Sequence, residues 1–221
     1  MAVDIVYTPT KTAVTQQEDA VMYYSARNVC EKLKILNDVR HVGNGGFDAL
    51  GRDGGVVYVV GHGNAGGKIG THADALGAKS LMKAMLADGL PKNPGGTVTI
   101  HLYACASGTS VRTGYLLWRK DPYAMRFAKY LAEAGFNDFM IVGYVGFMNL
   151  SGKHSLNYHM QKSKETVWSG SALARGDDAP TITFRVNAGA CARVQGEEWK
   201  QYSEVRVHRG RANSLVATIR K

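Results

Sequence analysis

Two runs of β-branched residues constrain the fold of this chain more than any other feature. Residues 56–60 read Val-Val-Tyr-Val-Val, and residues 97–103 read Thr-Val-Thr-Ile-His-Leu-Tyr. Continuous runs of this kind are typical of strands buried on both faces, as in parallel sheets. Such a sheet needs helical crossovers between its strands, so the runs also predict helices in the intervening chain.

Helical segments alternate with the strands in the first two thirds of the chain. The sequence predicts strands over residues 3–8, 56–60, 97–103 and 139–142, and helices over residues 15–36, 78–86 and 121–134. The first helix follows a capping-box pattern, Thr15 to Glu18. Alternation of this kind predicts an α/β fold with a mostly parallel sheet and helices on both faces. Residues 61–77 contain six glycines and predict a loop.

The character of the sequence changes after residue 150. Residues 181–186, 204–208 and 215–219 alternate apolar and polar side chains, as exposed antiparallel strands do. We therefore expect a core over residues 1–150, and a β-rich basic extension over residues 151–221 that packs on the same domain.

Composition excludes several classes of protein. At 221 residues and 45% apolar side chains, the chain can bury a sizeable core. Its three cysteines, Cys30, Cys105 and Cys191, form no CxxC or Cys/His cluster, so neither a disulfide framework nor a structural metal is expected. Cys30, on an apolar helix face, and Cys191 are expected to be structural. The sequence shows no transmembrane segment and no signal peptide, which favours a cytoplasmic protein or one exported by another route.

Charge is distributed unevenly along the chain. The net charge is +9, and residues 1–110 hold 10 Lys and Arg against 9 Asp and Glu, whereas residues 111–221 hold 17 against 9. This asymmetry predicts a localised anionic partner. The basic residues are scattered rather than clustered, and no P-loop is present, so nucleic acid and nucleotide are not expected partners.

Two reactive side chains follow the two β-branched runs. His62 comes two residues after the first run, and Cys105 two residues after the second. The carboxyl ends of adjacent parallel strands meet at one edge of a sheet, so His62 and Cys105 are expected to lie together. An imidazole can accept the thiol proton and later protonate a leaving amine. The amides of Gly63 and Cys105 can form an oxyanion hole. His72, in the same glycine-rich segment, is an alternative base.

A hydrophobic strand ending in Gly-His-Gly, followed by a second ending in Ala-Cys, resembles the caspase-like cysteine peptidases. The resemblance spans roughly residues 50–150 and is closest in layout to the self-processing domains of bacterial toxins. It implies a caspase-like fold, with Cys105 as nucleophile, His62 as general acid and base, and the amides of Gly63 and Cys105 as oxyanion hole. The caspase signature Gln-Ala-Cys-Arg-Gly is absent, so a preference for aspartate is not implied.

The same resemblance implies further features. Residues 143–148 should border the substrate pocket, which nominates Tyr144, Val145 and Gly146 for substrate binding. An aspartate orients the histidine in the toxin branch, and Asp4 is the candidate for that role. The basic C-terminal extension binds inositol hexakisphosphate in that branch, so the resemblance implies an inositol phosphate as the candidate activator here. No metal or other cofactor is expected.

The residues and the resemblance together predict a cysteine endopeptidase with a Cys–His dyad that acts on a protein or peptide. The resemblance implies that it is a bacterial effector or toxin processing domain. Transpeptidase and deamidase activities are open on the same dyad. The alternative is a non-catalytic binding module that engages a polyanionic ligand through the basic C-terminal half.

Overall fold

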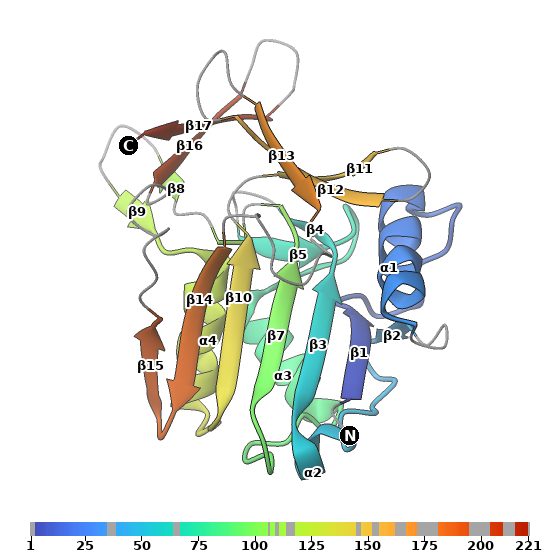
Figure 1. Ribbon diagram of the computed structural model, residues 1–221, viewed down its shortest axis with the longest axis vertical. Helices are drawn as coiled ribbons and strands as arrows, with labels where there is room; N and C mark the ends of the chain where they lie inside the picture. Colours follow the sequence, from blue (N-terminus) through green and yellow to red (C-terminus); the bar gives the residue numbers. More distant parts are fainter. Residues whose placement is uncertain are drawn as a thin grey trace.

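Seven strands form the central sheet, in the order β15-β14-β10-β7-β3-β1-β2 (Figure 1). The computed structural model describes residues 3–34, 39–63, 67–105, 107–108, 111–113, 118–144, 147–151, 155–161, 167–171, 181–194, 204–209 and 215–220. The strands are β1 (Val3–Thr8), β2 (Val39–His41), β3 (Gly55–Val60), β7 (Val98–Tyr103), β10 (Phe139–Tyr144), β14 (Thr181–Asn187) and β15 (Ala190–Arg193). The first five are parallel, and β14 runs antiparallel to β10 and β15, so the predicted, mostly parallel sheet is confirmed.

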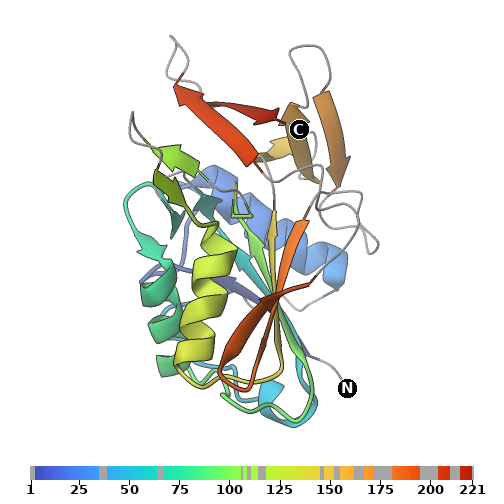
Figure 2. The same ribbon diagram turned by 90° about the vertical axis from the view of Figure 1, so that its left-hand side faces the viewer.

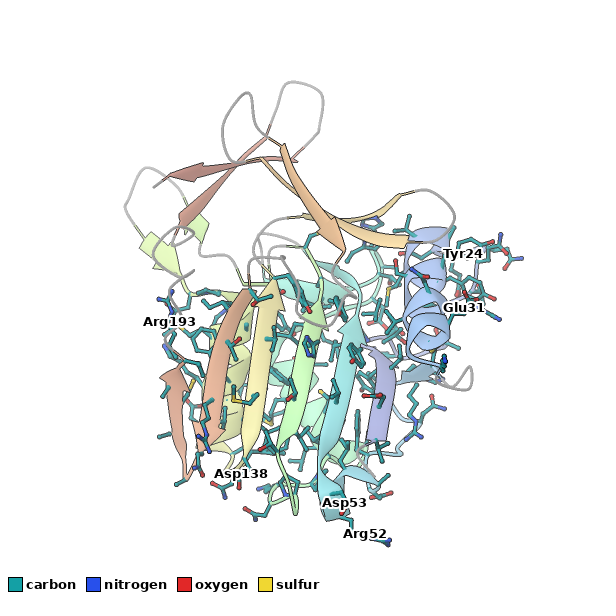
Figure 3. The ribbon with its side chains drawn as sticks, viewed as in Figure 1. Tyr24, Glu31, Arg52, Asp53, Asp138 and Arg193 are labelled. Carbon is teal, nitrogen blue, oxygen red and sulfur yellow. The ribbon has the colours of Figure 1, made fainter. Side chains whose placement is uncertain are left out.

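Helices cover both faces of this sheet, as predicted. They are α1 (Ala20–Leu33), α2 (Leu50–Asp53), α3 (Ala78–Ala87) and α4 (Tyr123–Glu133). Helix α1 lies on one face, and α3 and α4 lie side by side on the other (Figure 2). Tyr24 and Glu31 lie on the side of α1 that is turned away from the sheet (Figure 3).

The main hydrophobic core lies between the sheet and the α3–α4 layer. Alternate residues of β3 and β7 join the helices in one buried cluster, which includes Val57, Val59, Ile100, Leu102, Leu81, Met85, Phe127 and Leu131. The β-branched runs form strands because their side chains can be buried on both faces of the pleat. Truncating a fully buried ring such as that of Phe127 would cost about 3–5 kcal/mol.

The start of α1 differs from the capping-box prediction. Thr15 and Glu18 do bond one another, through Thr15 Oγ1 to Glu18 Oε2 at 3.0 Å, but they close a separate turn. The helix begins at Ala20, and Asp19 is its N-cap, accepting a hydrogen bond from the amide of Met22 at 3.0 Å. This shift of four residues matters for the site below.

The glycine-rich segment predicted as a loop instead forms a small sheet. Its strands are β4 (His62–Gly63), β5 (Lys68–Gly70) and β6 (Ala75–Gly77). Strands of two or three residues are too short to show an alternating pattern, which is why the sequence did not predict them. The sheet gives His62 a fixed place in a ladder, opposite Gly70.

Strand β14 corrects the expected division of the chain at residue 150. It is antiparallel as predicted, but it pairs with β10 along its length as part of the central sheet. Ile182, Phe184 and Val186 are buried, so this strand is a core element and not an exposed one. The central sheet therefore combines strands from both predicted regions.

Further short strands lie beyond the carboxyl edge of the central sheet (Figure 1). They are β8 (Val111–Thr113), β9 (Trp118–Lys120), β11 (Phe147–Ser151), β12 (Ser155–Gln161), β13 (Val167–Ser171), β16 (Glu204–Arg209) and β17 (Leu215–Arg220). Strands β11 to β13 form one antiparallel sheet, and β8–β9 and β16–β17 form hairpins. Among the described helices, none has the length and hydrophobicity needed to cross a membrane.

Candidate active site

The candidate site lies where the connections of the central sheet change direction. From β1 the chain passes through α1 to β2 on one side, whereas from β3 it passes through α3 to β7 on the other. The two loops that leave β1 and β3 therefore diverge at the carboxyl edge, which is where open α/β sheets bind ligands. Asp53 and Asp138 mark the opposite, amino edge (Figure 3). His62 follows β3 on the carboxyl edge, and Cys105 follows β7.

Gly63 brings the two predicted catalytic segments into contact. Strands β3 and β7 are paired up to Val60 and Tyr103, and the amide of Gly61 extends the ladder by donating to Tyr103 O at 3.2 Å. A Cβ at Gly63 would overlap the carbonyl oxygen of Cys105 and lie 2.8 Å from its amide nitrogen. Only a residue without a side chain fits here. The two backbones predicted to supply an oxyanion hole are thus direct neighbours.

His62 is hydrogen-bonded to Asp19, a residue that the sequence did not predict for the site. Its Nε2 lies 3.1 Å from Asp19 Oδ1 and 2.9 Å from Oδ2, and the hydrogen bond is made to Oδ1. The side chain of Asp19 is 7% exposed and that of His62 is 28% exposed. A carboxylate only accepts, so Nε2 carries the shared proton, and Nδ1 is the ring nitrogen left for a thiol.

Asp19 is held in place by the helix that it caps. Its Oδ1 also accepts from the amide of Met22, and negative charge is favoured at a helix N-terminus. The sequence signal for this residue was present, since an aspartate directly precedes the apolar positions of the helix. The capping box at Thr15 masked it, because both residues are acceptable N-caps.

The structure places Asp4 far from His62, which corrects the expected orienting residue. Asp4 lies on β1 opposite Val56, six positions before His62 along the neighbouring strand. At roughly 3.3 Å per residue, the separation is about 20 Å, which a side chain of two rotatable bonds cannot span. Asp19 occupies the position expected of Asp4.

The turn that follows Cys105 is anchored by Ser107, which is 2% exposed. Its Oγ donates to Leu102 O at 2.8 Å and accepts from the amide of Tyr144 at 2.8 Å. Its carbonyl accepts from the amide of Ala124, in the first turn of α4, at 2.9 Å. These bonds tie the turn to the ends of β7 and β10 and to α4.

Tyr144 does not present a free surface to a substrate. Its side chain is fully buried, its amide donates to Ser107, and its carbonyl accepts from Gly108 at 2.8 Å. Both backbone groups that a bound peptide would use are therefore occupied. Tyr144 therefore offers no exposed side chain to a substrate, whereas Val145 and Gly146 lie outside the described residues.

His101 is a structural histidine within β7. Its Nδ1 lies 2.9 Å from the hydroxyl of Tyr144, and its ring stacks on Tyr58 at 5.3 Å between centroids. Burial lowers the pKa of His101 to about 4, so the ring is neutral near pH 7 and is not a candidate acid or base at that pH.

The other cysteines stand apart from this edge. Cys30 is buried in α1, as expected, and Cys191 is half-buried on β15. Burial raises the pKa of the Cys191 thiol, against the opposing effect of Lys129, which makes it a poorer nucleophile. Within the described residues, no three His, Cys, Asp or Glu side chains are grouped to hold a metal ion.

The structure does not describe most side chains of the extension that is expected to bind an anion. These residues lie between 145 and 180 and beyond 194. The prediction of an inositol phosphate activator therefore stays a prediction. Comparison with models of known protein families and with curated protein sequences finds no match to this chain. The roles of Cys105, His62 and Asp19 consequently depend on their chemistry and geometry.

Proposed function

We propose that this protein is a cysteine endopeptidase of the caspase-like type, with Cys105 as nucleophile, His62 as general acid and base, and Asp19 as the residue that orients His62. The observation that carries the proposal is the contact of Gly63 with the backbone of Cys105, made by two segments 42 residues apart in the sequence. That contact brings the histidine segment to the thiol at the edge where α/β sheets bind substrates.

The chemistry follows from the protonation pattern of His62. Asp19 holds the proton of Nε2, so Nδ1 can accept the proton of the Cys105 thiol while Sγ attacks the peptide carbonyl carbon. The amides of Gly63 and Cys105 would stabilise the oxyanion of the tetrahedral intermediate, each typically by about 3 kcal/mol. When the C–N bond breaks, His62 returns the proton to the leaving amine, and Cys105 retains the acyl group as a thioester.

Water completes the cycle by the reverse steps. His62 accepts a proton from water while the water oxygen attacks the thioester carbonyl carbon. The proton returns to Sγ when the carboxylic acid leaves. Asp19 favours the imidazolium that forms in both half-reactions, because a nearby negative charge stabilises the protonated ring. The role of Asp19 is positional and electrostatic, and it does not itself exchange a proton.

A covalent probe tests the assignment of Cys105. We expect a library of peptides carrying a thiol-reactive acyloxymethyl ketone to label the wild-type protein and not Cys105→Ala. Cys191→Ala is the matched control, because it removes a half-buried thiol from β15 and should keep full labelling. The proposal fails if the wild-type protein is not labelled, or if Cys105→Ala is labelled equally.

The products of a peptide library identify the reaction. An endopeptidase yields two fragments whose new ends define the preferred residue before the cleaved bond. A transpeptidase would join the acyl fragment to an added amine, and a deamidase would change a side-chain amide by one mass unit without cutting the chain. Either product without peptide cleavage would move the protein to that reaction class while retaining Cys105 as nucleophile.

The charge asymmetry favours one second function, the binding of a polyanion by the C-terminal half. A binding module without catalysis would show strongly salt-dependent affinity for inositol hexakisphosphate that is independent of Cys105. An activator would instead raise the rate at which the probe labels Cys105. Unchanged labelling at saturating inositol hexakisphosphate would exclude the activator role.

A further inference from the structure

His72 stacks on the imidazole of His62 at the candidate site. The two ring centroids are 4.7 Å apart and the ring planes differ by 18°, which is a parallel stack. His62 belongs to β4, whereas His72 lies in the turn between β5 and β6, ten residues later. His62 is thereby contacted both at its edge, by Asp19, and on one face, by His72.

The turn that carries His72 is fixed at several points. The amide of Thr71 donates to Asp74 O at 2.9 Å, and the amide of Asp74 donates to Thr71 Oγ1 at 2.9 Å. The carboxylate of Asp74 also accepts from the amide of Lys11, in the segment after β1, at 2.7 Å. The turn is therefore closed on itself and bonded to a second segment, which fixes the position of His72 beside His62.

The small sheet behind this turn is braced by α4. The hydroxyl of Tyr123 donates to Leu76 O in β6 at 3.1 Å, and the guanidinium of Arg126 donates to Gly67 O at 3.4 Å. Helix α4 is also bonded to the turn after Cys105, because the amide of Ala124 donates to Ser107 O. One helix thus supports both the His72 turn and the nucleophile turn, which keeps their relative placement constant.

We propose that His72 is a positioning residue, which holds the ring plane of His62 so that Nδ1 stays directed for proton transfer with Cys105. The Asp19 hydrogen bond fixes Nε2 but allows the ring to swing about that bond. A flat side chain on one face of the imidazole removes this freedom. The proposal rests on the catalytic role proposed above for His62, and its test includes a readout that does not require catalysis.

The kinetic test separates the ring of His72 from its nitrogens. His72→Phe retains a flat ring and should keep at least half of the rate at which the peptide probe labels Cys105. His72→Ala removes the stack, and the rate should fall roughly tenfold or more, because small misplacements of a catalytic group carry costs of this order. His41→Ala, at a half-buried histidine on β2, is the control and should label like the wild-type protein.

Two kinetic results would overturn the proposal. Equal labelling rates in His72→Ala and wild type would show that the stack is dispensable. An equal loss in His72→Phe and His72→Ala would show that a ring nitrogen is required, as for the alternative base, and would remove the positioning role. Thermal unfolding of each variant identifies losses that come from a destabilised fold.

Nitrogen-15 NMR of histidine-labelled full-length protein gives the second readout, with the His62 signals assigned from their absence in His62→Ala. Wild type and His72→Phe should show sharp His62 ring signals with the proton on Nε2. His72→Ala should keep that tautomer, because Asp19 remains, but its His62 ring signals should be broadened by swinging of the ring about the Asp19 hydrogen bond. Equally sharp His62 ring signals in His72→Ala overturn the proposal even if wild type proves to have no labelling. Absent labelling with the expected broadening would instead reject only the catalytic function.

Discussion

Cys105 and His62 reach the same edge of the sheet from segments of different construction. The turn after Cys105 is fixed from within the core, by a buried serine that bonds to two strands and a helix. The segment that carries His62 pairs His62–Gly63 with Lys68–Gly70 at the edge of a small sheet, and its imidazole is fixed by two side chains, that of Asp19, which is 7% exposed, and that of the exposed His72.

This difference separates stability from activity. Contacts around the Cys105 turn belong to the folded core, so their loss should unfold the protein as well as disturb the nucleophile. Contacts around His62 involve side chains that the core does not need, so their loss should lower activity in a protein that stays folded. The predictions below test this separation, from the largest expected effect to the smallest.

Gly63→Ala should abolish labelling of Cys105 by the peptide probe, with a loss of at least about a hundredfold. The added Cβ would overlap the Cys105 carbonyl and force the two segments apart. Gly77→Ala is the matched control, because Gly77 belongs to the same small sheet and a Cβ there would meet no atom within 4 Å. Wild-type labelling in Gly63→Ala would contradict the close approach of the two backbones.

Ser107→Ala should lower the free energy of unfolding by about 2–3 kcal/mol, because the amide of Tyr144 and the carbonyl of Leu102 both lose a buried partner. Urea unfolding measures this loss. Ser80→Ala, at an exposed position of α3, should change stability by less than about 0.5 kcal/mol. A fully stable Ser107→Ala protein would mean that the Cys105 turn is not anchored by the core.

Asp19→Asn should lower the labelling rate roughly tenfold while the urea midpoint stays within experimental error. Asparagine caps a helix as well as aspartate does, but it lacks the charge that stabilises the imidazolium of His62. Glu18→Gln, one residue earlier and exposed, should leave labelling unchanged. If Asp19→Asn unfolds the protein, the histidine segment is part of the structural core after all.

His101 predicts a pH dependence of the free energy of unfolding. Its folded pKa of about 4 lies below the value of about 6.5 for an unfolded histidine, so the unfolded state binds the proton more tightly. Its contribution to stability is therefore present above pH 6.5 and decreases as the pH falls toward 4. The loss between pH 7 and pH 5 should be about 1–2 kcal/mol.

Urea unfolding at the two pH values measures this effect, and His101→Phe should flatten it while changing absolute stability at both. An identical pH dependence in His101→Phe and wild type would show that His101 is protonated as readily in the folded core as in water. Such a result would also question the stacked arrangement of His101 with Tyr58 on the face of β3 and β7.

The sequence predicted the parts of the site that depend on buried strands. The runs before His62 and Cys105 could be recognised because β-branched residues recur without polar interruption, and adjacency of the two strands then brought Gly63 to Cys105. The sequence could not identify Asp19. As the N-cap of the first helix it competes with Thr15, which is nearby and equally suitable. As the residue that orients His62 it competes with Asp4, because the contact with His62 joins residues 43 positions apart. The pairing of β14 with β10 and the burial of Tyr144 are likewise long-range properties, which local patterns do not encode.

The hydrogen bond from Tyr144 to Ser107 has a consequence for the order in which the site is completed during synthesis. Asp19, His62 and Cys105 leave the ribosome in that order, but the serine that anchors the Cys105 turn finds its partner 37 residues later. A nascent chain that ends before Tyr144 would carry Asp19 and the proposed catalytic residues His62 and Cys105 without the anchored turn. The proposed proteolytic activity would therefore arise only after β10 has joined the sheet, when the newly made protein has folded its own core.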